Sequence, residues 1–148
     1  LVLAEIYDAS GSIRSPETPR LINVSTLARV AAEADLAAGF VIGGATARTV
    51  LIRGVGPSLA RVGVSGFMPD PRLAVYNNDT GQRLDGNDDW AGALEVSAAG
   101  DAVGAFALQG GTSRDAALLL TLPPGAYSAR VSGAGSGGLV LVEVYEVP

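Results

Sequence analysis

Short stretches of branched and aromatic residues, separated by turn-forming residues, make up the hydrophobic pattern of this chain. The alternation of apolar and polar side chains is cleanest at 72–76 and 126–132. Alternation with a period of two residues is typical of a β-strand that buries one of its faces. Further strands are expected at 1–9, 20–30, 40–42, 49–55, 82–84, 113–122 and 139–147.

Turn signals between these segments indicate the fold class. The glycines at 43–44, the run 78–81 (NDTG) and the run 123–125 (PPG) each separate two expected strands. One helical turn is expected at 58–62, and a short helix or irregular crossover at 91–107, where glycines oppose a long helix. About nine strands joined in this way predict an all-β fold, a β-sandwich or jelly roll.

The two ends of the chain carry nearly the same sequence. The first eight residues (LVLAEIYD) align with 139–146 (LVLVEVYE), with five identities and three conservative replacements. Similar segments that recur at a fixed separation are typical of proteins built from repeats. A terminal strand at 1–9 is therefore duplicated at 139–147. Its candidate assembly residues are Leu1, Val2, Leu3, Ile6, Tyr7, Leu139, Leu141, Val142, Val144 and Tyr145.

Three interpretations of the duplication remain open. In the first, both strands occupy equivalent places in one pseudo-symmetric sandwich. In the second, the chain runs from the last strand of one module to the last strand of the next, in a tandem array with a period of 138 residues. In the third, one copy completes the sheet of a neighbouring subunit, and head-to-tail strand exchange builds a filament. The last two predict linear self-assembly, with a second copy or a neighbouring repeat as the partner.

Composition removes several classes of function. The length of 148 residues fits a single domain, 1–148. Because the chain contains no Cys, His or Lys, disulfides, zinc fingers, a Ser-His-Asp triad and a P-loop lysine are excluded. Ten arginines against fifteen acidic residues give a net charge of −5, which disfavours nucleic acid as a partner. We therefore expect a protein that is not an enzyme.

Hydropathy and the beginning of the chain add two expectations. The sequence contains no apolar run long enough for a membrane span. The mean hydropathy of +0.33 is nevertheless high, which indicates a large core or an apolar surface that a partner covers. The chain begins at Leu1 without a signal-like segment, so we expect a processed product or an excised segment.

One acidic segment is a candidate metal site. Asp85, Asn87, Asp88 and Asp89 supply oxygen ligands at short spacing, and calcium prefers such ligands. The spacing does not match an EF-hand loop. A solvated hairpin turn, with Asx-type hydrogen bonds to the backbone, accounts for the same residues without a metal. Calcium is therefore the one candidate cofactor.

Several stretches resemble a module of large secreted and surface-attached bacterial proteins, where it stands as a repeat or a C-terminal appendage. They are 19–26 (PRLINVST), 49–59 (TVLIRGVGPSL), 87–90 (NDDW), 122–127 (LPPGAY) and 131–133 (VSG). The second half is also similar to pre-peptidase C-terminal β-sandwich domains. The resemblance implies a non-catalytic module located outside the cell or at its surface. The alternative is a carbohydrate- or surface-binding accessory module of a secreted enzyme.

Overall fold

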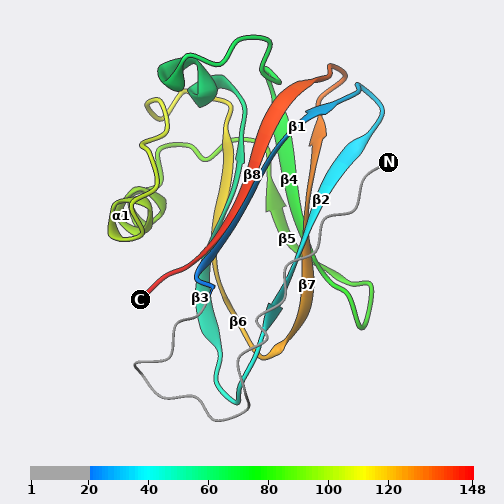
Figure 1. Ribbon diagram of the computed structural model, residues 1–148, viewed down its shortest axis with the longest axis vertical. Helices are drawn as coiled ribbons and strands as arrows, with labels where there is room; N and C mark the ends of the chain where they lie inside the picture. The colour runs from blue at the N-terminus through cyan, green and yellow to red at the C-terminus, as the bar shows by residue number, and fades with distance from the viewer. Residues whose placement is uncertain (1–20) are drawn as a thin grey trace.

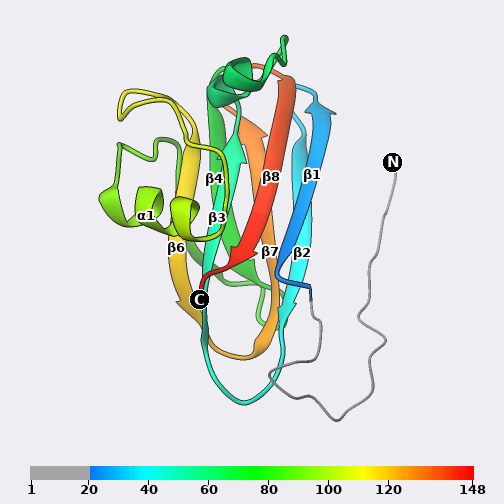
Figure 2. The same ribbon diagram turned by 60° about the vertical axis from the view of Figure 1, so that its left-hand side comes forward.

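The computed structural model describes residues 21–148, which form two four-stranded antiparallel sheets packed face to face (Figure 1 and Figure 2). Sheet A has the order β1-β8-β3-β6, and sheet B has the order β2-β7-β4-β5. The predicted all-β sandwich is confirmed, with eight strands in the described part of the chain. Their bounds are β1 (Asn23–Val30), β2 (Asp35–Ile42), β3 (Arg48–Val55), β4 (Pro71–Asn77), β5 (Arg83–Asn87), β6 (Ala116–Leu122), β7 (Gly125–Gly133) and β8 (Gly138–Glu146).

The core between the sheets follows the alternation of the strands. Leu73 and Val75 of β4 and Ala129 and Val131 of β7 are at most 1% exposed, whereas Arg130, between the last two, is exposed. The predicted faces of these two strands are therefore confirmed. Burying such side chains stabilises the fold by roughly 25 cal/mol for each Å² of apolar surface removed from water.

Of the described strands, β2 and β5 differ most from their predicted extents. β2 begins at Asp35, five residues before the predicted strand, because its small residues still alternate between the two faces. β5 extends to Asn87, since the backbone from Asp85 onwards pairs with β4. The expected acidic loop is thus partly a strand at the edge of sheet B. The register of this pair shifts between Val75 and Tyr76.

A second layer covers the outer face of sheet A. The crossover from β5 to β6 contains α1 (Leu94–Ala102), which Figure 2 shows beside β6, outside the sandwich. Trp90 and the buried face of α1 pack on Leu51 of β3 and Ala117 of β6, and form a separate apolar cluster. The expected helical turn is η1 (Pro57–Val62). No helix within residues 21–148 is long and apolar enough to cross a membrane.

Gly138, the first residue of β8, is required by a close backbone approach. A Cβ atom at this position would lie 2.4 Å from the backbone nitrogen of Met68 and 2.6 Å from its Cα. Backbone atoms cannot move aside as the end of a side chain can. We therefore predict that Gly138→Ala lowers the free energy of unfolding by about 3 kcal/mol in urea denaturation. Gly43→Ala is the control, because a Cβ there meets nothing within 4 Å; an equal loss in both variants would contradict the prediction.

Candidate functional site

The duplicated strand occupies the interior of sheet A. β8 pairs with β1 along one edge, from Asn23↔Tyr145 to Val30↔Gly138, and with β3 along the other edge. Val142 and Val144 face the core and are at most 5% exposed. The predicted assembly residues on β8 are Leu139, Leu141, Val142, Val144 and Tyr145. The others, Leu1, Val2, Leu3, Ile6 and Tyr7, lie outside the described residues.

A buried ion pair joins β8 to β3 on the outer face of sheet A. Arg53 and Glu143 are direct register partners, 2% and 4% exposed, with 3.0 Å between Arg53 Nε and Glu143 Oε2. The contact is an ion pair without the alignment of a hydrogen bond. Arg53 Nη1 donates a hydrogen bond to the carbonyl oxygen of Phe106 (2.8 Å), and the guanidinium lies 4.7 Å from the centre of the Phe106 ring. Arg53 thus connects both strands to the second layer.

Tyr145 completes this group, which we call the Arg53 cluster: Arg53, Phe106, Glu143 and Tyr145. The Tyr145 hydroxyl donates a 2.7 Å hydrogen bond to Glu143 Oε1. Burial, followed by this hydrogen bond, raises the pKa of Tyr145 from 10.0 to about 12. The neutral phenol is therefore the form that the fold stabilises.

A second buried polar group fixes one end of the sandwich. Asp115 is fully buried, and its Oδ1 accepts hydrogen bonds from the backbone N–H groups of Gly56 (2.8 Å) and Ser58 (3.1 Å). Its Oδ2 accepts from the hydroxyls of Ser58 and Ser113. Ser58 is itself fully buried, so this Ser–Asp contact is closed to a substrate. The glycine-rich segment after β3 is therefore held by a carboxylate and has a structural role.

An open groove lies beside this group. Its volume is about 520 Å³, which is within the range of small-molecule sites. Arg114 at its edge forms an ion pair with Asp70, with 2.5 Å between Nη1 and Oδ2. The groove combines one aromatic ring with amide, hydroxyl and guanidinium groups. It is lined by Pro57, Phe67, Pro69, Gln109, Gly110, Thr112, Ser113 and Arg114.

The candidate calcium ligands are used in part by the fold. Asp85 Oδ1 accepts a hydrogen bond from the N–H of Gly86 (2.7 Å), and Asn87 Nδ2 donates to the carbonyl oxygen of Ala117 (2.7 Å). Asp88 and Asp89 follow β5 and are exposed. Within residues 21–148, no three Asp, Glu, His or Cys side chains are grouped so that they could hold a metal ion. The calcium site stays a prediction.

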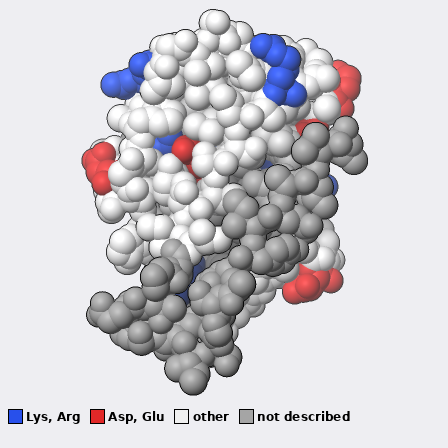
Figure 3. Space-filling model, viewed as in Figure 1, with Lys and Arg blue, Asp and Glu red and all other residues white. Residues whose placement is uncertain are grey.

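A small apolar patch lies on the outer face of β1 and β8, where α1 does not cover it, beside the exposed Ser25 and Arg29 of β1. Leu27 of β1 is 49% exposed, and Leu139 and Leu141 of β8 are half-buried beside it. Where grey atoms do not cover this side of the molecule, Figure 3 shows a surface that is mostly uncharged. These residues form an exposed apolar surface of the kind that the high mean hydropathy indicates. That a neighbouring copy covers this surface remains a prediction.

No protein-family model and no curated protein sequence matches this chain. β8 and the Arg53 cluster are therefore the features from which a function is inferred.

The buried ion pair gives a prediction on stability. Glu143→Gln leaves the Arg53 guanidinium without its counter-charge in a buried position, so we expect a loss of about 3 kcal/mol in urea denaturation. The control is Asp70→Asn, which breaks the ion pair with Arg114, whose side chain is 64% exposed. That change should cost less than about 1 kcal/mol. Equal losses in the two variants would contradict the assignment.

The raised pKa of Tyr145 gives a prediction on pH. The folded chain keeps the Tyr145 proton up to about pH 12, whereas an unfolded chain releases it near 10.0. The stabilisation that the protonated Tyr145 contributes to the fold is complete below pH 10, and it is lost as the pH rises towards 12. Urea denaturation between pH 9 and 12 should show a weaker pH dependence for Tyr145→Phe than for the natural chain. Tyr76→Phe is the control for removing a phenol, and identical pH profiles in all three proteins would rule out this role of Tyr145.

Proposed function

We propose that this chain is a non-catalytic, extracellular structural module of a linear tandem array. In this proposal, consecutive copies are joined covalently, and residues 1–9 are the counterpart of β8 for the preceding copy. The filament built by strand exchange is the less favoured form of linear assembly. The observation that carries the proposal is that β8 of the same chain fills the position that an exchanged strand would need.

Backbone pairing supports the covalent form. β8 has a partner strand of its own chain on each edge, β1 and β3. An incoming copy of the same sequence would have to displace β8, or to add at an outer edge of a sheet. At an outer edge it would have one neighbouring strand where β8 has two. Nearly identical sequences are expected where two strands occupy the same environment. The environment of an edge strand differs from that of β8, which lies in the interior of sheet A.

Side-chain chemistry supports the same form. Glu5 and Tyr7 are the counterparts of Glu143 and Tyr145 in the sequence alignment. On β8, the carboxylate of Glu143 balances the charge of the buried Arg53 and accepts a hydrogen bond from the hydroxyl of Tyr145. The Arg53 of this chain already has its carboxylate. A second Glu-x-Tyr strand is therefore explained most directly by the Arg53 of another copy.

The ends of the module suit a covalent array. Asn23, at the beginning of β1, is the register partner of Tyr145 near the end of β8. The backbone N–H of Glu146 donates a 2.8 Å hydrogen bond to the carbonyl oxygen of Ile22. The chain thus enters and leaves the sandwich on neighbouring strands at the same end. Residues 10–22 would be the connection between one copy and the next.

The extracellular location is proposed from the resemblance to modules of secreted bacterial proteins. A chain without cysteine contains no thiol that an oxidising environment could alter, and this suits a durable external scaffold.

The alternative is an accessory module that binds a carbohydrate or a cell surface. The groove of about 520 Å³ beside Phe67 and Arg114 favours it, because it offers an aromatic ring next to polar groups. Specific retention of the single module on a polysaccharide, lost in Phe67→Ala, would favour this alternative.

A two-copy chain tests the array. Residues 1–147 are joined directly to residues 10–148, so that the duplicated strand serves as the junction. We expect both copies to fold, with a melting temperature close to that of the single chain, and a monomer at all concentrations in sedimentation. The matched control is the chain 10–148, which should be a stable monomer with an unchanged melting temperature.

Two results would contradict the array. Filaments of the 148-residue chain in negative-stain micrographs, absent from the chain 10–148, would show strand exchange. A chain 10–148 that fails to fold would show that residues 1–9 belong to the same sandwich, as the pseudo-symmetric interpretation requires.

A further inference from the structure

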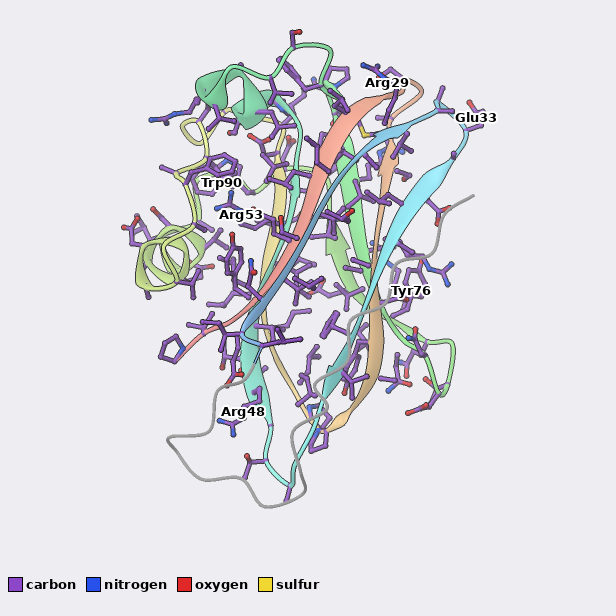
Figure 4. All side chains as sticks on the ribbon, viewed as in Figure 1. Arg29, Glu33, Arg48, Arg53, Tyr76 and Trp90 are labelled. Carbon is purple, nitrogen blue, oxygen red and sulfur yellow. The ribbon has the colours of Figure 1, made fainter. Side chains whose placement is uncertain are left out.

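A small cavity lies between α1 and the outer face of sheet A. Its volume is about 40 Å³, and Arg53 of β3 and Trp90 of the crossover both line it. Figure 4 shows these two side chains close together on the side of the sheet that faces α1. The remaining lining residues are Val96, Ser97, Gly100, Asp101, Ala105, Phe106, Ala107 and Leu108.

Two buried hydrogen-bond donors in the wall of this cavity have no partner within residues 21–148. Arg53 is 2% exposed and Trp90 is 8% exposed, yet Arg53 Nη2 and Trp90 Nε1 form no hydrogen bond. Guanidinium and indole nitrogens only donate. Buried donors in folded proteins are nearly always paired, with protein groups or with ordered water. The pair of donors therefore points to an acceptor in the cavity.

Size limits what this acceptor is. A volume of about 40 Å³ exceeds the roughly 10–15 Å³ that one water molecule requires. It is far below the roughly 300 Å³ at which small-molecule sites begin. Gly100 of α1 lines the cavity, and a Cβ atom there would meet nothing within 4 Å.

Charge selects a neutral acceptor over an anion. The positive charge of Arg53 is already balanced by Glu143, at 3.0 Å. Asp101, at the C-terminal end of α1, adds a negative charge to the cavity wall. The C-terminal end of a helix also carries a partial negative charge. An anion would therefore be repelled, whereas a neutral water molecule can accept hydrogen bonds from both donors.

We propose that this cavity is a hydration site, in which ordered water accepts hydrogen bonds from Arg53 Nη2 and Trp90 Nε1 and links α1 to sheet A. The site does not depend on tandem assembly. Its water gives Arg53 Nη2 a hydrogen-bond partner, while Nε lies in the ion pair with Glu143 and Nη1 donates to the carbonyl oxygen of Phe106.

Crystallography of the 148-residue chain tests the ligand directly. We expect an electron-density peak of water size, within about 3.2 Å of both donors, in crystals grown without halide. The same site should give no anomalous signal in crystals grown in sodium bromide. An empty cavity would overturn the proposal, and a bromide ion between the two donors would overturn the choice of a neutral ligand.

Discussion

β8 receives backbone hydrogen bonds along both edges, from β1 over its whole length and from β3 over the segment 141–146. Its inward face supplies valines to the core, and its outward face supplies Glu143 to the buried guanidinium of Arg53. Without this strand, sheet A would separate into β1 and the pair β3-β6. The architecture of the sandwich therefore depends on β8, and so does the interpretation of its duplicate at 1–9.

The Arg53 cluster extends this dependence to the second layer. A buried ion pair is costly to desolvate, and removing one of its partners is strongly destabilising because the other charge is left uncompensated. Here the arginine fixes β3 against β8 and, through Phe106, holds the segment that follows α1. The hydroxyl of Tyr145 then orients the carboxylate of Glu143. The pairing of the central strands and the docking of α1 are thus parts of one polar arrangement.

The sequence predicted those features that depend on neighbouring residues. Alternation within 72–76 and 126–132 was enough to assign faces, because each strand has one buried side. The polar groups were not predicted, because Asp115 acts on Ser58, and Arg53 on Glu143, across long separations in the chain. Only the Glu-x-Tyr pattern shared by the two terminal strands could have indicated the second contact. The polar side chains of Asp85 and Asn87 are typical of a loop. The two residues form an edge strand because their backbone pairs with β4, which the sequence pattern does not indicate.

Amide hydrogen exchange along β8 distinguishes a strand held by its own module from an exchanged strand. If β8 is the central strand of its own module, the amides of 140–145 will exchange only through global unfolding, at rates matching the core of β3. These rates will not depend on protein concentration and will not change when residues 1–9 are removed. Rapid exchange along β8, or protection that requires residues 1–9 of a second chain, would show that β8 is not held by its own module.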